Sequence, residues 1–401
     1  MNLEELLRTA VDDGVRSVPP GLADGAIRRA KRQRRTTRIA VAGGVAAFGL
    51  AAAAIAVVDP TEIRTDAPPA GGTDGTVVDL AHLDAGPPPE IAWYADGALH
   101  HGTESTPFDL ETDYPVIIRL PDGYLVWESV PGPDSADHTA TIWLVPDDGE
   151  RVELGSGDLT PPVVSAAGDI AAWGVRNDDW VLDEEAREQG VTSSIVVVDL
   201  TTGEVAHRLD EAPSPSASPK GFVREDRVVF EAAANTAWGA YVWEFDGEVT
   251  LLRADTGVDA VSQGTGLVRL AASPPMTLDL EAGTTLVPEA DPGWPVYSPG
   301  GRYVATITRP GTTLGTGTGR DQLVIRDAYS GEEVVRLDTE APESLPVWEN
   351  ETGLVFGAYQ DGATAALVRC TVDGECELAT EPQVLDDDPD TFDIPYRTSN
   401  W

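Results

Sequence analysis

The chain has 401 residues, of which 41% are hydrophobic and 24% charged, so most of it can form buried cores. Its formal net charge of −41 argues against a nucleic-acid-binding protein, because neutralising phosphate groups requires a basic surface. Two cysteines are too few for a disulfide-rich scaffold or a zinc site with four thiolates.

The charge is distributed unevenly along the chain. Residues 1–38 contain nine basic and five acidic residues, and seven of the basic ones lie between Arg28 and Arg38. The net charge of residues 1–38 is therefore +4, and residues 39–58 carry no charge. Because the whole chain has a net charge of −41, residues 59–401 have a net charge of −45. Such a difference between two parts of a chain indicates two different environments.

The uncharged stretch at 39–58 has the sequence IAVAGGVAAFGLAAAAIAVV. Twenty apolar residues, at about 1.5 Å per residue, are long enough to cross the hydrocarbon layer of a membrane as one helix. Because the basic run precedes this helix, the positive-inside rule places the N-terminus in the cytoplasm and residues 59–401 outside the cell membrane. The alternative is a secreted protein cleaved after Ala56, in which Arg34-Arg35 loosely resembles a twin-arginine signal. The long segment before the apolar run disfavours cleavage.

The basic stub at 1–38 has two possible roles. Apolar residues recur at helical spacing from Leu3 to Val11 after Asn2, which can cap a helix, so a short helix is predicted there. The stub either orients the insertion of the membrane helix or docks a cytoplasmic regulator such as a sigma factor.

Residues 59–88 are rich in Pro, Gly, Asp and Thr, a composition typical of a flexible linker. A short strand is expected within it, between Thr76 and Leu83. From residue 89 the helical periodicity disappears, and short apolar or alternating runs are separated by Gly, Asp and Pro. This pattern predicts an all-β sandwich, barrel or propeller.

Internal repeats decide among these folds. Residues 195–210, IVVVDLTTGEVAHRLD, align without gaps with residues 323–338, LVIRDAYSGEEVVRLD, and both predict two strands joined by a turn that contains Gly. A second motif, such as VYSPGGRYVATI at 296–307, precedes most of these hairpins. Together the two motifs form a four-stranded unit, the blade of a β-propeller.

The length of this region sets the number of blades. Residues 89–401 accommodate about seven blades of 40–45 residues, with six as the alternative. We therefore predict an extracytoplasmic β-propeller over 89–401. Its partial unit at 91–110 is expected to share a blade with the other end of the chain, which closes the ring and removes exposed sheet edges.

Two kinds of turn resemble those of a known family. Pro121-Asp122-Gly123 and Ser298-Pro299-Gly300-Gly301 are similar to the Ser-Pro-Asp-Gly turn of TolB-like and WD-repeat-like propellers, and residues 202–204 and 330–332 resemble their hairpin turn. The resemblance covers residues 91–380 and implies the fold rather than a function. The layout of basic stub, single span and acidic ectodomain is similar to that of uncharacterised membrane-anchored propeller proteins of actinobacteria.

No catalytic residue, metal site or cofactor is predicted. The five histidines form no His-x-x-x-His pair, and the sequence contains neither Cys-x-x-Cys nor Gly-x-Ser-x-Gly. His207, His100 and His101 are therefore expected to be packed or surface residues. The run of glycine and threonine at 311–320 lacks the Gly-Lys-Ser/Thr ending of a phosphate-binding loop, so we interpret it as a connection between strands.

The candidate binding residues lie in an insertion at 177–190, where Trp180 is surrounded by carboxylates. Trp180, Asp178, Asp179 and Asp183 can anchor a partner, or Trp180 can instead cap the core beside its loop. Three enlarged connections, at 131–138, 176–192 and 309–320, are expected to join the second and third strands of their blades and to share one face.

Cys370 and Cys376 are predicted to form a disulfide. The intervening residues can form a hairpin loop, Val372-Asp373-Gly374, with Gly374 left-handed, which sets the two cysteines opposite each other. The exported side of the membrane is oxidising.

The function favoured by the sequence is that of a non-enzymatic binding or scaffolding module. The negative charge favours a basic protein, a peptide or a cation as its partner, with no nucleic acid. Two other functions stay open: an extracytoplasmic enzyme whose residues come from several blades, and a signalling protein that acts through its cytoplasmic stub.

Overall fold

The computed structural model describes most of the chain after residue 74. The described residues are 75–110, 112, 115–131, 138–148, 150–176, 193–214, 216–234, 237–245, 247–272, 275–286, 294–308, 321–339, 345–360, 364–384 and 397–398. The basic stub at 1–38 and the membrane helix predicted at 39–58 lie outside them. In the described part, we find no helix with the length and apolar character needed to cross a membrane.

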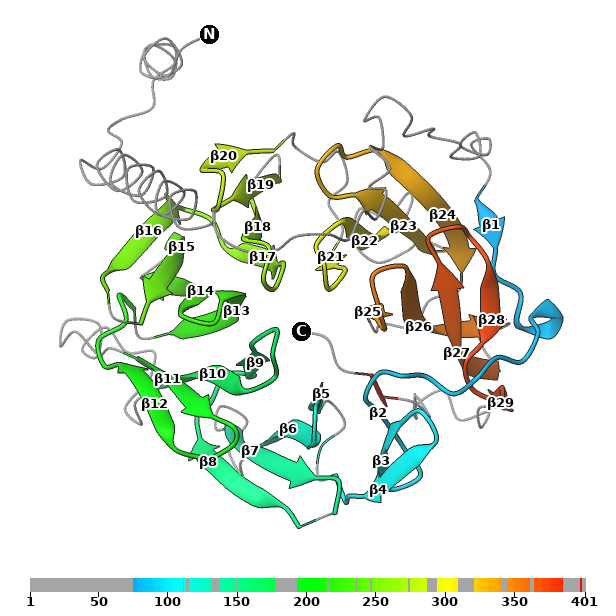
Figure 1. The fold of residues 1–401 in the computed structure, drawn as a ribbon, viewed down its shortest axis with the longest axis horizontal. Coiled ribbons are helices and arrows are strands. Elements are labelled where there is room, and N and C mark those ends of the chain that lie inside the picture. Colours follow the sequence, from blue (N-terminus) through cyan, green and yellow to red (C-terminus); the bar gives the residue numbers. More distant parts are fainter. Residues whose placement is uncertain are drawn as a thin grey trace, which may run out of the picture. The chain divides into compact units, whose positions relative to one another are not determined.

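The described strands form seven sheets, arranged as blades around a central axis (Figure 1). Blade 1 contains β2 (Trp93–Ala95), β3 (Ala98–His101), β4 (Glu104–Pro107) and β30 (Arg397–Thr398). Blade 2 contains β5 (Val116–Leu120), β6 (Gly123–Pro131), β7 (His138–Pro146) and β8 (Val152–Gly157). Blade 3 contains β9 (Val163–Val164), β10 (Ile170–Val175), β11 (Ser194–Asp199) and β12 (Val205–Leu209).

The remaining blades follow the same plan. Blade 4 contains β13 (Ala217–Arg224), β14 (Arg227–Ala234), β15 (Ala237–Glu244) and β16 (Val249–Ala254). Blade 5 contains β17 (Val258–Val261), β18 (Leu267–Leu270), β19 (Met276–Asp279) and β20 (Thr284–Thr285). Blade 6 contains β21 (Trp294–Tyr297), β22 (Tyr303–Thr308), β23 (Asp321–Asp327) and β24 (Glu333–Thr339), with β1 (Thr76–Val77) added outside β24. Blade 7 contains β25 (Val347–Trp348), β26 (Gly353–Gln360), β27 (Thr364–Thr371) and β28 (Cys376–Leu378), and β29 (Gln383–Val384) also pairs with β27.

The ring closes in blade 1, where two distant parts of the chain meet. The C-terminal strand β30 pairs antiparallel with β2, with Trp93 opposite Thr398. The partial unit at 91–110 therefore shares a blade with the other end of the chain, as predicted, and the prediction of seven blades is confirmed. This pairing ties the C-terminal end of the chain to the first blade and so closes the ring.

The repeated sequence forms a repeated turn. In blade 3 the carboxylate of Asp199 accepts hydrogen bonds from the backbone N–H groups of Thr201 and Thr202, at 2.8 and 3.0 Å, and Gly203 has a φ of +72°. In blade 6, Asp327 and Gly331 occupy the same positions, and the φ of Gly331 is also +72°. Asp and Gly recur at this spacing because one ties the turn and the other tolerates its left-handed backbone.

The hydrophobic core of the described residues is divided into seven clusters, one between each pair of neighbouring blades. Trp173, for example, packs against Leu125 and Ile142 of blade 2, and Trp243 belongs to the cluster between blades 3 and 4. Both tryptophans therefore pack between blades. Each blade is stabilised by its two neighbours rather than by a core of its own.

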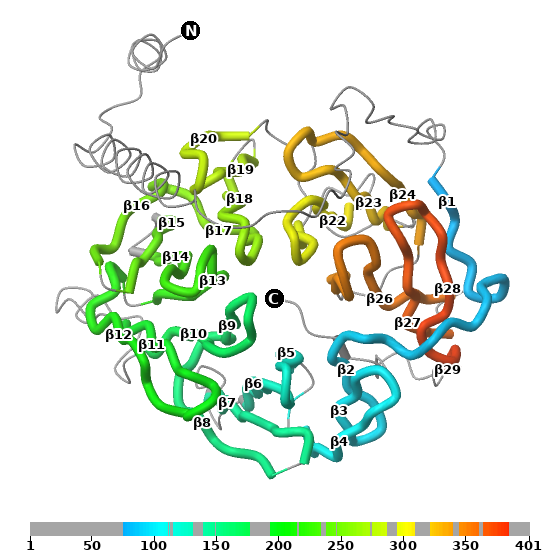
Figure 2. Tube along the Cα trace, in the orientation of Figure 1, coloured from blue at the N-terminus to red at the C-terminus, as the bar shows by residue number. Residues whose placement is uncertain are grey.

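Residues 75–90 form a strap along the outside of blades 6 and 7 (Figure 2). β1 pairs in parallel with β24, a short 3₁₀ helix follows at Leu80–His82, and Ala85 forms a bridge to Leu378 of β28. Val78 and Leu80 are buried in the cluster between blades 6 and 7. The prediction of a flexible linker over 59–88 is thus wrong for residues 75–88, because apolar side chains within the Pro- and Gly-rich sequence pack on the propeller. Residues 59–74 lie outside the described part.

Candidate binding site

One face of the propeller carries the connections between second and third strands and those between blades. Neighbouring strands of a blade run in opposite directions, so these two kinds of connection end on the same side. We call this side the loop face. The enlarged connections at 131–138, 176–192 and 309–320 join β6 to β7, β10 to β11 and β22 to β23, as predicted for second and third strands. Most of their residues lie outside the described part of the chain. The same holds for the candidate residues Trp180, Asp178, Asp179 and Asp183.

A pocket of about 350 Å³ opens on the loop face between blades 4 and 5. It is lined by Glu231, Trp238, Asp255, Thr256, Gly257 and Ala271. Residues 255–257 connect β16 to β17, Trp238 lies near the start of β15, and Ala271 follows β18. All the connections that border the pocket thus belong to the two kinds that define the loop face.

Trp238 forms the apolar wall of this pocket. Its alternation with Ala240 and Val242 places it on the side of β15 that packs against blade 5, where both of those residues are buried. Trp238 lies near the start of the strand and is 48% exposed. Among the described residues, its indole has no hydrogen bond, ring stacking or cation–π contact. A large aromatic side chain on a rigid strand is therefore available to a partner.

Asp255 supplies a free carboxylate at the rim. Its φ of +57° lies in the left-handed region, which Asp and Asn tolerate better than most residues. The backbone N–H of Thr256 donates to the carbonyl oxygen of Trp238 at 3.0 Å, which holds this connection beside β15. Asp255 is exposed and, within the described part of the chain, its side chain forms no hydrogen bond or ion pair. The turn thus presents a negative charge next to the indole.

Glu231 lies deeper in the pocket and is already paired. Its Oε1 atom lies 2.8 Å from Nζ of Lys220, and its Oε2 atom accepts a hydrogen bond from the backbone N–H of Val258 at 3.2 Å. A Cβ atom at position 257 would approach Oε2 to 2.9 Å, so Gly257 allows the carboxylate to reach the first strand of the next blade. Glu231 therefore joins blade 4 to blade 5.

A second pair of opposite charges lies beside this one. Arg269 is 1% exposed, and its Nε atom lies 3.9 Å from Oδ2 of Asp259. Burial raises the pKa of the Asp259 carboxyl, and the positive charge of Arg269 opposes the increase. The carboxylates of Glu231 and Asp259 thus have cationic partners, whereas no ion pair to Asp255 is found among the described residues.

The histidines of the described residues have structural contacts. His100 stacks on Trp93 with ring centroids 4.2 Å apart, and His207 stacks on Phe245 at 4.5 Å. His100 therefore packs within blade 1, and His207 of blade 3 packs against a residue of blade 4, so both are packed residues, as predicted. Within the described ranges, no three His, Cys, Asp or Glu side chains are grouped so that they could hold a metal ion.

The two cysteines lie directly opposite each other on β27 and β28. Their sulfur atoms are at bonding distance, their Cα atoms are 4.2 Å apart, and Gly374 has a φ of +84°. The predicted register and the left-handed Gly374 are both confirmed. Cys370 is fully buried in the cluster between blades 6 and 7, beside the residues that anchor the strap.

Comparisons with known proteins give similarity of fold. No protein-family model and no curated protein sequence matches the chain. Among solved structures, TolB from Acinetobacter baumannii is 14% identical, with a TM-score of 0.39, over 67% of this chain and 81% of that one. A prolyl endopeptidase is 12% identical, with a TM-score of 0.45, over 68% of this chain and 43% of that one. An acylaminoacyl peptidase from Pyrococcus horikoshii is 15% identical, with a TM-score of 0.37, over 67% and 52% of the two chains.

Proposed function

We propose that this chain is a non-enzymatic binding or scaffolding module whose loop face engages a basic protein or peptide. The main support is the pocket in which the half-exposed Trp238 lies beside the carboxylate of Asp255, which has no ion pair or hydrogen bond within the described residues. The seven-bladed ring supplies a rigid platform for this face, because every blade is packed against two others. Rigid aromatic anchors surrounded by polar groups are typical of protein-binding surfaces.

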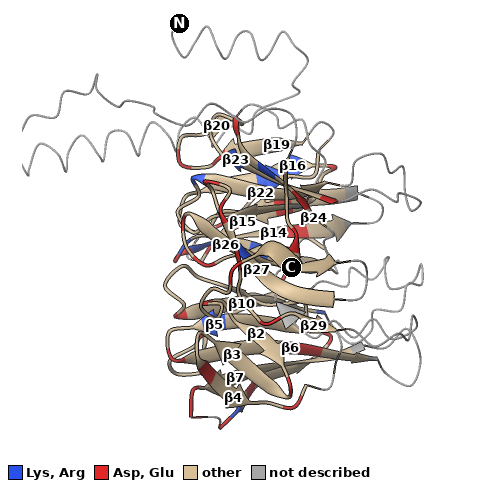
Figure 3. Cartoon of the chain, turned by 90° about the vertical axis from the view of Figure 1, so that its right-hand side faces the viewer, with Lys and Arg blue, Asp and Glu red and all other residues tan. Residues whose placement is uncertain are grey.

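The charge supports the choice of partner. Residues 59–401 carry a net charge of −45, which attracts cationic proteins and repels nucleic acid. Acidic positions are distributed over many of the described strands and turns (Figure 3). This broad negative field increases the rate of encounter with a basic partner, and local contacts then determine where the partner binds.

Binding of synthetic polypeptides tests this function. The purified full-length protein in a nonionic detergent is titrated with poly-L-lysine and with poly-L-glutamate at low and at physiological salt. Saturable binding of the cationic polymer alone, weakened but retained at physiological salt, is the expected result. Absence of that binding, or equal binding of both polymers, would contradict the proposal. Trp180→Ala is included because Trp180 is the anchor proposed from the sequence, and it is expected to weaken binding.

The proposed setting of the module is the outer face of the cell membrane. The support is the uncharged segment at 39–58, preceded by the basic run and followed by an acidic region. Protease treatment of intact cells is expected to remove residues 59–401 and to spare a short N-terminal stub. Recovery of the protein as a soluble species that begins after Ala56 would instead support the secreted alternative.

A signalling role is the second candidate, and the pattern of apolar residues from Leu3 to Val11 favours it. In this role the stub docks a cytoplasmic regulator such as a sigma factor. Deletion of residues 1–27 keeps the basic run and the membrane segment. A changed phenotype with normal protein levels would support signalling, whereas an unchanged phenotype would leave the stub as an anchor.

A further inference from the structure

We propose that the pocket between blades 4 and 5 is a binding site for a single arginine side chain of the partner. This inference rests on the proposed function, because it assumes a basic polypeptide on the loop face. It adds the position of the contact, the chemical group that is recognised and the two side chains that recognise it, Trp238 and Asp255.

The charges in the pocket define what it can accept. The glutamate at its base is neutralised by Lys220 at 2.8 Å and by the N–H of Val258, so it does not require a second cation. The indole of Trp238 and the carboxylate of Asp255, which have no polar partner among the described residues, border the same opening and are more exposed than Glu231. A ligand that stacks on an aromatic face and donates to a carboxylate satisfies both groups.

A guanidinium group has both properties at once. It is planar, so it can lie over the indole in a cation–π contact, while its N–H groups point outward in the same plane toward a carboxylate. A lysine ammonium is a compact point charge that is more strongly hydrated, and it stacks less well. The neighbouring apolar surface, which includes Ala271, can cover the aliphatic part of an arginine side chain.

The site is also preorganised. Trp238 lies on a strand that pairs with β14 on one side and with β16 on the other. The hydrogen bond from Thr256 to the carbonyl oxygen of Trp238 fixes the turn that carries Asp255. Binding therefore requires little ordering of the protein, and the interaction energy is not consumed in forming the site.

Three acetylated and amidated hexapeptides separate the chemical possibilities. They alternate glycine with arginine, lysine or citrulline, and citrulline has the shape of arginine without its charge. Steady-state binding to the captured full-length protein is measured by surface plasmon resonance at two salt concentrations. We expect affinity to decrease from the arginine peptide to the lysine peptide and again to the citrulline peptide.

The variants locate the contact. Trp238→Ala is expected to weaken binding of the arginine peptide about tenfold, the size typical of a partly desolvated cation–π contact, while Trp238→Phe retains most of it. Asp255→Asn tolerates the same left-handed backbone and is expected to weaken binding about threefold and to reduce the salt dependence. Tyr329→Ala and Asp373→Asn are matched controls in turns between third and fourth strands, on the opposite face, and should not change the affinity.

The outcomes separate this inference from the proposed function. If the cationic peptides bind and Trp238→Ala binds as tightly as the unaltered protein, the pocket assignment is wrong and the binding function stands. Equal binding of the citrulline and arginine peptides would overturn recognition of a cation at this site. If neither cationic peptide nor poly-L-lysine binds, the proposed function fails together with the inference. A tenfold loss of affinity for the arginine peptide in Trp238→Ala, with unchanged affinity in the control variants, supports both the pocket assignment and the proposed function.

Discussion

Two junctions between blades use the same chemistry and differ in what surrounds it. Between blades 4 and 5, Glu231 pairs with Lys220 and accepts a hydrogen bond from the N–H of Val258, where the next blade begins. Between blades 7 and 1, Glu349 pairs with Arg369 and accepts a hydrogen bond from the N–H of Glu90 at 2.6 Å. In both junctions a carboxylate of one blade accepts a hydrogen bond from a backbone N–H group at or near the start of the next blade.

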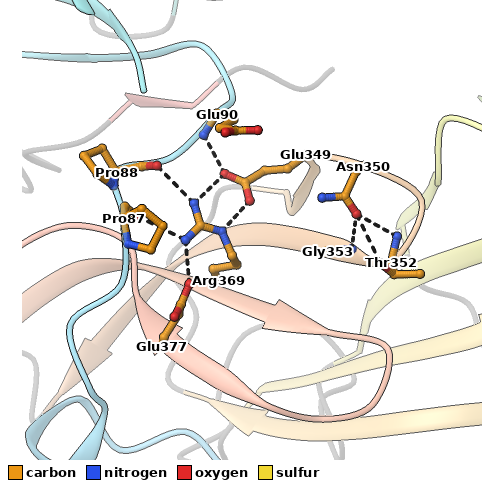
Figure 4. Close-up of polar contacts among 9 residues, drawn as sticks. All are labelled: Pro87, Pro88, Glu90, Glu349, Asn350, Thr352, Gly353, Arg369 and Glu377. Carbon is orange, nitrogen blue, oxygen red and sulfur yellow. Dashed lines mark hydrogen bonds and ion pairs between the residues drawn. The ribbon is translucent and has the colours of Figure 1, made fainter. Parts of the chain in front are cut away.

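The second junction is sealed by the strap. Arg369 also donates to the carbonyl oxygens of Pro87 and Pro88, both at 3.1 Å, and to Glu377 at 2.7 Å (Figure 4). The side chain of Glu349 is 3% exposed, against 14% for Glu231. Hydrogen bonding to Glu349 raises the pKa of Arg369, so this cation is permanently charged.

The ion pair alone does not determine the role of a junction. At the sealed junction, the cation has protein partners and the strap covers it, which completes the ring. At the junction between blades 4 and 5, no such strap is described, and an aromatic ring and a carboxylate remain available. We therefore assign the sealed junction between blades 7 and 1 to stability, and we propose the junction between blades 4 and 5 for binding.

Two tryptophans, one in the core that the strap covers and one in the pocket, give the largest expected difference. Trp348 is 8% exposed in the cluster between blades 6 and 7, and its Nε1–H donates to the carbonyl oxygen of Val296 at 3.0 Å. Trp348→Ala is expected to lower the free energy of unfolding by about 3–5 kcal/mol, because it leaves a cavity between blades 6 and 7. Trp238→Ala is expected to change it by less than about 0.5 kcal/mol. Denaturant unfolding of both variants checks this, and similar losses would remove the distinction.

The two basic partners provide the next test. Arg369→Met leaves the carboxylate of Glu349 buried without its cationic partner. We expect it to lower the free energy of unfolding by about 3 kcal/mol. Lys220→Met affects a pair in which the side chain of Lys220 is 32% exposed, and it is expected to cost about 1 kcal/mol or less. The same unfolding measurement compares the two variants. If Lys220→Met lowered the free energy of unfolding more than Arg369→Met, the junction between blades 4 and 5 would contribute more to stability, contrary to our assignment.

The disulfide is expected to stabilise the sealed region by about 2–3 kcal/mol, since it closes a short loop. β28, which carries Cys376, also holds the strap, because the N–H of Gly86 donates to the carbonyl oxygen of Leu378 at 2.8 Å. In Cys370→Ala/Cys376→Ala, we expect faster hydrogen exchange of strap amides and little change near Trp238. Two reactive thiols in the denatured, unreduced protein would show that the bond does not form.

The smallest effect is expected for an exposed ion pair in blade 2. Hydrogen bonding to Arg119 lowers the pKa of Asp147, so ionised Asp147 favours the folded state. This contribution is present above the pKa of Asp147 in the unfolded chain, about 4, and is lost as the pH falls through the folded pKa. Asp147→Asn is therefore expected to lower the free energy of unfolding by less than about 1 kcal/mol at pH 7. It should have no effect once the pH is below the pKa of Asp147 in the folded protein. An equal loss at pH 7 and pH 3 in thermal unfolding would contradict this.

The ring was predictable because its signals are local. The Asp and Gly positions of the hairpin turns recur in the sequence, and the partial unit at 91–110 lacks the strand that β30 provides. The strap was not predictable in the same way. Its composition is that of a linker, and its order depends on contacts of Val78 and Arg369 with residues hundreds of positions away.

The pocket was missed for a similar reason. The alternation of Trp238 with Ala240 and Val242 predicts a buried side chain, and only the position of blade 5 leaves it half exposed. Asp255 has no motif, since its left-handed backbone and its place beside β15 arise from the turn between two blades. The sequence directed attention to Trp180, which lies outside the described residues, but it did predict the face on which the pocket opens.

Hydrogen exchange with and without the arginine peptide tests the central claim most directly, because it follows both junctions in one sample of the full-length protein. We predict that the peptide slows exchange in residues 237–244 and 255–258 and leaves the strap at 84–90 unchanged. The same protection should be absent in Trp238→Ala. Slower exchange at the strap alone, or at turns of the opposite face with no change at 255–258, would contradict the assignment of the pocket as the binding site.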